Sequence, residues 1–411
     1  MFADTLLDLD APVSLEETPL ARDSAWHGQL QLLASLPHPL MTLAPALTTA
    51  VCAGLRADFA TMGLCHGMPP VPTAFWMDHI SEAVLHWLGA HADALFDLTP
   101  LARQLATDGQ AIRDQFDAPG WTAHPVFQAA FAPLGARWGM GVPLLDRQDR
   151  CLGFIYLYRA EAAGRFSDAE QNRLRAARDR LRGIGSARPH ARNQALRTVA
   201  TRSALLRVDA HGHIRARSAD AYELLFLGQH QRVGSLTWAA PDLSALPPAV
   251  AERAQRLLSD PEPPAVDELT LRDDGGGMRY VLQRLLHAGA DDPELIITLC
   301  HLEPIDLAVA RQLTHWPLTP RERQLAVASA GSASQRDMAD ALGCSLGTLK
   351  GYTKSLYAKV GVGSRDELIA RLLEAPGESG ETARAFRSVG ANASRPPVPT
   401  KLPGPARPTD G

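Results

Sequence analysis

The strongest helical pattern in the chain lies near its C-terminal end, between positions 318 and 373. Within it, four inward positions recur at the spacing of one helix face, namely Leu349, Thr353, Leu356 and Val360. The pattern predicts a helix that begins near Ser345 and ends at Gly361, a residue type suited to the left-handed position after a helix.

Capping signals predict three further helices around this one. Each begins with a hydroxyl residue that is followed three positions later by an acid: Thr319 with Glu322, Ser334 with Asp337, and Ser364 with Glu367. In a capping box, the hydroxyl accepts a hydrogen bond from a free amide, while the acid accepts one from the amide of the cap residue. The segment is therefore predicted to fold as a compact module of four short helices.

The outward face of the helix at 345–361 is rich in lysines and small residues. The members of this face are Thr348, Lys350, Gly351, Lys354, Ser355 and Lys359. No acid lies between Ser345 and Arg365. Lysines can reach phosphates or guanine acceptors, and small residues let a helix approach base edges in the major groove. A solvated surface helix would show the same face, so this helix alone leaves both interpretations open.

The whole module resembles the LuxR-type helix-turn-helix. The matching motifs are LTPRE at 318–322, MA at 338–339, SxxTLK at 345–350, KVGV at 359–362 and SR at 364–365. The resemblance implies that the third helix is the recognition helix. It also implies that Lys350, Gly351 and Lys354 face the groove and that Thr348 and Lys359 lie near phosphates.

Three residues depart from the usual family pattern. Gly331 lies one position earlier than the glycine that normally precedes the scaffold helix, and Thr353 replaces an aliphatic core residue. Gly351 lies in the interior of the recognition helix, where glycine costs roughly 0.5–1 kcal/mol relative to alanine. We therefore expect a helix of low intrinsic stability, whose specificity for bases rests on few contacts.

Residues 25–183 show a mixed pattern of helices and strands. The pattern predicts a helix through 43–55, strands at 59–65, 71–76, 137–146 and 151–160, and a helix that Ser167 caps. The segments at 141–144, 152–157 and 166–170 resemble a GAF domain. This resemblance implies an antiparallel sheet packed against helices, which serves either for sensing or for dimerisation.

A small, polar and basic linker is predicted at 184–200, followed by a second sheet-containing unit at 201–304. The motif LxxDxxGxI at 206–214, with further strands at 266–287 and 293–304, resembles a PAS domain. A connecting helix is expected at 305–316, before the helical module at 317–374. The acidic segment 1–24 and the segment 375–411, which is rich in Pro, Gly, Ser and Ala, are expected to be disordered.

Composition limits the classes of function. A chain of 411 residues is long enough for two or three domains, and its net charge of -4 means that any nucleic-acid affinity must be local. The five cysteines are scattered and odd in number, which favours a reducing cytoplasm over a disulfide framework. Cys65 is interpreted as a core cysteine, since no second ligand lies at metal-binding spacing. We find no signal peptide, membrane span, P-loop or nucleophile elbow.

These patterns predict a multidomain α+β protein with GAF-like and PAS-like antiparallel-sheet domains, followed by an all-α, four-helix LuxR-type module. We expect a cytoplasmic transcriptional regulator that binds double-stranded DNA as a homodimer, without a cofactor, a metal or enzymatic activity. A small-molecule effector and RNA polymerase are candidate partners, and a membrane is not. The alternative is a constitutive DNA-binding protein whose N-terminal domains only dimerise or act as a scaffold. The sequence specifies no ligand-pocket residue, operator or sign of regulation.

Overall fold

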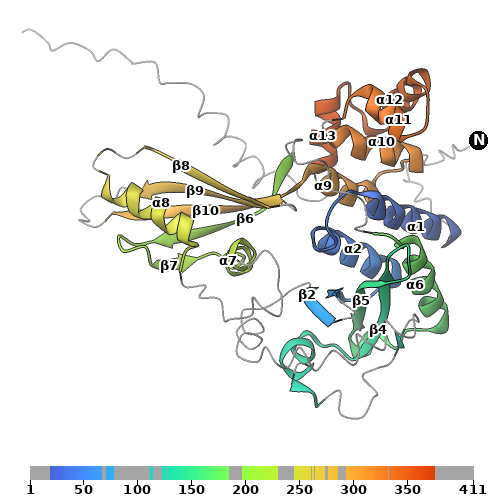
Figure 1. The fold of residues 1–411 in the computed structure, drawn as a ribbon, viewed down its shortest axis with the longest axis horizontal. Helices are drawn as coiled ribbons and strands as arrows, with labels where there is room; N and C mark the ends of the chain where they lie inside the picture. The colour runs from blue at the N-terminus through green and yellow to red at the C-terminus, as the bar shows by residue number, and fades with distance from the viewer. Residues whose placement is uncertain are drawn as a thin grey trace, which may run out of the picture.

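The computed structural model describes residues 19–66, 71–77, 112–113, 123–125, 127–184, 197–229, 245–260, 262, 264–273, 276–285, 293–331 and 333–374. Figure 1 shows two sheet-containing units and a C-terminal group of helices that lies beside the N-terminal helices. Within the described ranges, no helix is both long enough and apolar enough to cross a membrane.

Among its described residues, the first unit combines three helices with one sheet. Its elements are α1 (Pro19–Ser35), α2 (Leu40–Leu55), β1 (Phe59–His66), β2 (Val71–Met77), β3 (Ile112–Arg113), β4 (Trp138–Leu145), β5 (Cys151–Arg159) and α6 (Asp168–Arg180). A π-helical turn at Phe127–Phe131 and 3-10 turns at Ala132–Leu134 and Glu161–Ala163 connect parts of this unit. The helix and strands that the sequence predicts at 43–55, 59–65, 71–76, 137–146 and 151–160 are all present.

Pairing between distant segments assembles the first sheet. Its strands are antiparallel and follow the order β2-β1-β5-β4-β3. Met62 on β1 lies opposite Ile155 on β5, and both side chains are fully buried. Helix α2 packs on β1 and α6 packs on β4, while α1 contacts both helices. The helices and the inner face of the sheet therefore enclose one core.

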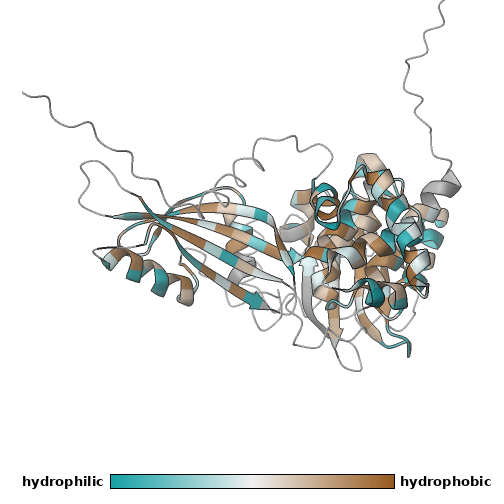
Figure 2. Ribbon diagram, turned by 90° about the horizontal axis from the view of Figure 1, so that it is seen from above, coloured by the Kyte–Doolittle hydropathy of each residue, from teal (hydrophilic) through white to brown (hydrophobic). Residues whose placement is uncertain are grey.

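The second unit has the same strand topology. It consists of β6 (Thr198–Val208), β7 (Ile214–Arg217), α7 (Ala221–Gln229), α8 (Pro248–Ser259), β8 (Asp267–Asp273), β9 (Gly276–Leu285) and β10 (Glu294–Pro304). Its antiparallel order is β7-β6-β10-β9-β8, so its first and last strands are adjacent, as in the first unit. The strands alternate between apolar and polar positions in Figure 2, which is the pattern of a sheet with one covered face.

Two predicted boundaries are wrong. Helix α1 begins at Pro19, so the segment 1–24 is not disordered throughout; its proline opens the helix at a position where a missing amide is tolerated. Strand β6 begins at Thr198, inside the predicted linker 184–200, because Thr198 pairs with Pro304 across the sheet. The remaining expectations of disorder, at 1–18 and 375–411, lie outside the described residues.

The C-terminal helices share one hydrophobic core with the first unit. Helix α9 (Ile305–Gln312) follows β10 directly, a 3-10 turn at Leu313–His315 follows it, and α9 contacts α1, α2 and the next helix. A single buried cluster includes Leu33 of α1, Leu307 of α9 and, further along the chain, Leu325. The helix expected at 305–316 is thus present as α9 and the turn that follows it, and it packs against other helices.

Polar contacts reinforce this packing. The Gln29 side-chain amide of α1 donates a 2.6 Å hydrogen bond to the carbonyl of Ala310 in α9, in a buried position. The His38 ring nitrogen Nε2 lies 2.9 Å from a carboxylate oxygen of Asp306. Breaking such a contact would leave a buried polar group without a partner, at a cost of about 1–3 kcal/mol. The contacts therefore hold α9 against the N-terminal helices.

Candidate nucleic-acid interface

Within the described residues, the C-terminal module contains α10 (Pro320–Ala330), α11 (Gln335–Ala341), α12 (Leu346–Val360) and α13 (Arg365–Leu373). Reciprocal capping boxes open α10 at Thr319 and α11 at Ser334, as predicted. The third predicted box is incomplete. Ser364 accepts from the amide of Glu367, but the Glu367 carboxylate accepts from the amide of Gly363 instead of that of Ser364.

Helix α12 has the predicted bounds and the predicted buried stripe. Its cap residue Ser345 accepts a hydrogen bond from the amide of Thr348, and Gly361 ends the helix in the left-handed region with φ 75°. Leu349, Leu356 and Val360 are buried. Thr353, the polar member of the stripe, is half-buried. Its hydroxyl donates to the Leu349 carbonyl at 2.9 Å, so this polar group has a hydrogen-bond partner within the helix, although the family usually has an aliphatic residue here.

The opposite face of α12 is open to solvent at Thr348, Lys350, Gly351 and Lys354. Among the described residues, no carboxylate forms an ion pair with Lys350 or Lys354. A Cβ atom added at Gly351 would meet nothing within 4 Å, so this glycine is not required by packing inside the protein. The structure therefore presents two exposed lysines and one exposed glycine on this part of α12.

Ser355 and Lys359 are oriented differently from the other four candidates. The Ser355 hydroxyl donates to Glu322 Oε1 at 2.7 Å, and the Lys359 ammonium lies 2.8 Å from Glu322 Oε2. The expectation that all six side chains share one outward face is therefore wrong for Ser355, whose hydroxyl turns toward α10. Lys359 keeps 37% of its side chain exposed, so its contact with a phosphate stays a prediction.

Glu322 holds α12 against α10. Its residue is only 3% exposed, and its carboxylate also accepts from the Thr319 amide at 2.8 Å. Burial alone would raise the pKa of this carboxyl group, but hydrogen bonds from Lys359, Thr319 and Ser355 lower it to about 2. Sequence reasoning gave Glu322 only a capping role, because its contacts with Ser355 and Lys359 join positions 33 and 37 apart along the chain.

Arginines fix the remaining helices by contacts with backbone carbonyls. Arg365 donates to the carbonyls of Ser329, Gly331 and Ala333, at 2.7, 2.6 and 3.2 Å. Arg321 donates to the Leu342 carbonyl at 3.0 Å, in the turn between α11 and α12. These hydrogen bonds attach the turns before α11 and α12 to other helices. They thereby fix the orientation of α12 in the module.

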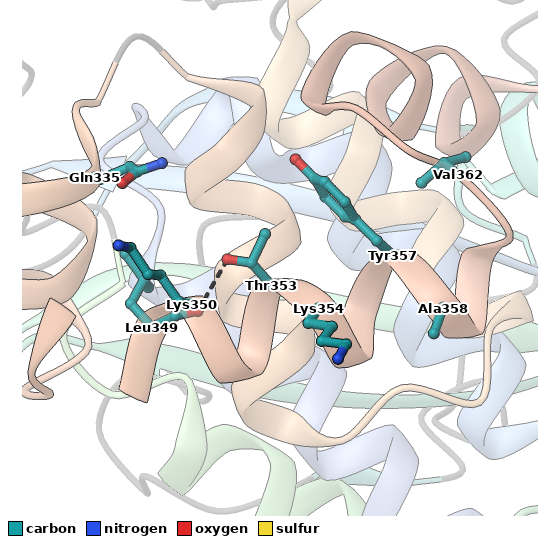
Figure 3. Close-up of a pocket in the computed structure, with 8 residues that line it drawn as sticks. All are labelled: Gln335, Leu349, Lys350, Thr353, Lys354, Tyr357, Ala358 and Val362. Atoms are coloured by element: carbon teal, nitrogen blue, oxygen red, sulfur yellow. Dashed lines mark hydrogen bonds between the residues drawn. The ribbon is translucent and has the colours of Figure 1, made fainter. Parts of the chain in front are cut away.

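An open groove of about 490 Å³ runs along one side of α12 (Figure 3). It is lined by Gln335, Leu349, Lys350, Thr353, Lys354, Tyr357, Ala358 and Val362. Figure 3 shows Gln335 of α11 and Lys350 of α12 on the same side of the groove. The lysines stand at the edge of a mostly apolar surface, so a bound polyanion would meet both charge and a shallow depression.

Comparison with known proteins assigns a class to this module. Residues 316–372 match the family described as bacterial regulatory proteins, luxR family, so the chain contains a LuxR-type helix-turn-helix domain. No curated protein matched the chain in sequence.

Solved structures give weaker likenesses. A Vibrio cholerae VqmA–ligand–DNA complex is 18% identical, with a TM-score of 0.22, and the match covers 42% of this chain and 82% of that chain. A VqmA dimer from the same organism without target DNA is 18% identical over the same shares, with a TM-score of 0.17. The E. coli DhaR(N)–DhaL complex is 13% identical over 69% of this chain and 90% of that chain, with a TM-score of 0.20. At such TM-scores these likenesses support no argument about the fold.

Proposed function

We propose that the protein is a transcriptional regulator that binds double-stranded DNA by placing α12 in the major groove. The observation that supports this most strongly is the solvent-exposed, acid-free face formed by Lys350, Gly351 and Lys354 within a LuxR-type domain. Lys350 and Lys354 contact phosphates or guanine acceptors, and Gly351 lets the helix backbone approach the bases. Thr348, at the start of α12, contacts a phosphate from the exposed N-terminal end of the helix.

Ser355 and Lys359 have a second role in this proposal. Both side chains bond to Glu322, so they hold the recognition helix at a fixed angle to α10. The exposed part of Lys359 adds a phosphate contact at the C-terminal end of α12. A preorganised helix loses less entropy on binding than a mobile one, which raises affinity without a new contact.

The first unit and α9 transmit a signal to the helical module. Their shared core supports this, together with the buried bond between Gln29 and Ala310. A ligand that binds one arrangement of the first or second unit more tightly than another would move α9 and change DNA affinity. The topology of the two sheets is consistent with the GAF-like and PAS-like resemblances. The alternative is a constitutive DNA-binding protein whose first two units only dimerise or act as a scaffold.

The protein acts as a cytoplasmic homodimer on two half-sites, recruits or blocks RNA polymerase, and has no enzymatic activity. A dimer is favoured because a single α12 offers only two lysines and one glycine to the groove, which is a small set of contacts for one specific site.

Selection of bound fragments from genomic DNA tests this function. Full-length protein should enrich a small set of sequences, and the variant with both Lys350→Ala and Lys354→Ala should enrich none of them. Arg371→Ala is the matched control, because it removes a positive charge from the same domain on α13, where Arg371 pairs with Glu374. Equal enrichment by the double variant and by Arg371→Ala would reject the proposal. A change in enrichment with metabolite extract separates the ligand-dependent form from the constitutive one.

A further inference from the structure

Two cysteines that are far apart in the sequence meet at one end of the first sheet. Cys65 lies near the end of β1, and Cys151 is the first residue of the neighbouring antiparallel strand β5. Leu64 lies opposite Gly153, so both cysteines fall just beyond the last registered pair of these strands. The two thiols lie close enough for each to shift the pKa of the other, and the Cys151 thiol also donates to the Gly153 carbonyl at 3.3 Å.

One register shift accounts for this meeting. On β4, Leu144 lies opposite Gly153 and the next residue, Leu145, lies opposite Cys151, so β5 has one extra residue at this point. A bulge changes the direction of side chains at the end of a strand. The two sulfur atoms can therefore face each other although successive side chains normally alternate between the faces of a sheet.

The two thiols differ in their surroundings. Cys65 is 7% exposed, whereas Cys151 is half-buried and reaches solvent. The hydrogen bond from Cys65 lowers the pKa of Cys151. The same hydrogen bond, together with burial, raises the pKa of Cys65. Because the thiolate is the nucleophile and Cys151 also reaches solvent, Cys151 is the sulfur that reacts first with an oxidant.

We propose that Cys65 and Cys151 are a site of reversible oxidation, at which a peroxide converts the pair into an intramolecular disulfide. The Cys151 thiolate attacks one peroxide oxygen, the O–O bond breaks, and the released hydroxide takes a proton from solvent. Cys151 is then a sulfenic acid. The Cys65 sulfur attacks the Cys151 sulfur, the S–O bond breaks, and the hydroxyl leaves as water with the Cys65 proton. Two thiols and one hydrogen peroxide thus give one disulfide and two waters.

The thiol pair lies beside a turn that contacts the end of α6. The amide of Gly183 donates to the Leu145 carbonyl at 3.0 Å, and Arg182 pairs with Asp149 in the β4–β5 turn. A covalent bond between Cys65 and Cys151 would join β1 to the start of β5 next to these contacts. The proposal rests on this local geometry alone and does not depend on DNA binding.

Peptide mapping of the intact chain after brief treatment with hydrogen peroxide tests the proposal. The free-thiol count should fall from five to three, and mass spectrometry without reductant should find one linked pair of peptides, from the regions of Cys65 and Cys151. Dithiothreitol should restore all five thiols. This measurement uses wild-type protein, so it stands even where a cysteine variant fails to fold.

Three substitutions sharpen the result. Cys151→Ser should leave Cys65 reduced, and Cys65→Ser should let Cys151 accumulate as a sulfenic acid that a dimedone probe traps. Cys344→Ser is the matched control, since Cys344 is half-buried like Cys151 but lies in the helical module; it should leave the linked peptide unchanged. Peroxide oxidation of Cys344 at the same rate as Cys151, or a disulfide only between two chains, would overturn the proposal.

Discussion

The Lys359 ammonium lies 2.8 Å from Glu322 Oε2, and this ion pair joins the end of α12 to the first turn of α10. The Glu322 carboxylate is nearly inaccessible, and it binds Ser355 with its other oxygen. One side chain therefore caps α10 and also fixes the angle of α12. This arrangement makes the stability of the module depend on the ionised state of Glu322.

Replacing Glu322 should show that dependence. The pKa of Glu322 is about 2 in the folded protein against an ordinary value of 4.5, so the unfolded chain binds the proton more tightly. Its stabilising contribution is fully present above about pH 4.5 and is lost as pH falls toward 2. We expect Glu322→Gln to destabilise the module by on the order of 1–3 kcal/mol at neutral pH. The measurement is denaturant unfolding of both proteins across this pH range.

The difference between wild type and Glu322→Gln should shrink as pH falls through that range. Glu374→Gln is a suitable control, because Glu374 pairs with Arg371 at the surface and should matter little. A stability difference that is constant with pH would show that the charge of Glu322 is not what holds α12.

Gly351→Ala should stabilise α12 by about 0.5–1 kcal/mol, because alanine is the better helix former and the added methyl group meets open space. Denaturant unfolding measures the change, and Gly361→Ala provides the contrast, since φ 75° at Gly361 disfavours a side chain. If DNA binding needs close approach of the backbone, the affinity of Gly351→Ala should fall while its stability rises. A less stable Gly351→Ala protein would contradict the helical geometry at this position.

Gln29→Ala should loosen the contact between α1 and α9. The substitution leaves the buried Ala310 carbonyl without its 2.6 Å donor, at an expected cost of about 1–3 kcal/mol. Hydrogen exchange of the α9 amides should become faster, while Gln255→Ala on the exposed side of α8 should leave it unchanged. Unaltered exchange in α9 would show that this bond does not hold the helical module against the first unit.

A small apolar or amphipathic metabolite should raise the melting temperature of the full-length protein and change its DNA affinity several-fold. A ligand at 100 times its Kd adds about 2.7 kcal/mol to the state that binds it. Thermal-shift screening followed by DNA titration with each hit measures both effects. Hits that stabilise the protein without altering DNA affinity would indicate a ligand pocket that does not control DNA binding. A broad screen without hits would favour the alternative in which the first two units only dimerise or act as a scaffold.

The sequence predicted local features of α12 well. Its bounds, its buried leucines and its capping residues follow from nearest-neighbour patterns, and so do the caps of α10 and α11. The helical period could not reveal that Ser355 and Lys359 bond to Glu322, since that carboxylate lies 33 and 37 positions away along the chain. Periodicity assigns a residue to a face of its own helix, and only tertiary packing decides what that face meets.

The same limit applies to the first sheet. The strands at 59–65 and 151–160 could be predicted separately, but the pairing of Phe59 with Tyr158 joins segments with no local link. For this reason Cys65 looked like an isolated core cysteine, and its contact with Cys151 became visible only in the fold. The packing of α9 on α1 was missed in the same way, because a short apolar helix resembles a connector when its partner is unknown.

The most direct test of the central claim is the affinity of single lysine variants for a DNA site that the wild-type protein selects. Lys350→Ala and Lys354→Ala should each weaken binding by on the order of 1–3 kcal/mol, with melting temperatures unchanged, because both side chains are exposed and lack ion pairs within the described residues. Arg371→Ala should bind like wild type. Wild-type affinity in both lysine variants would contradict the placement of α12 in the major groove.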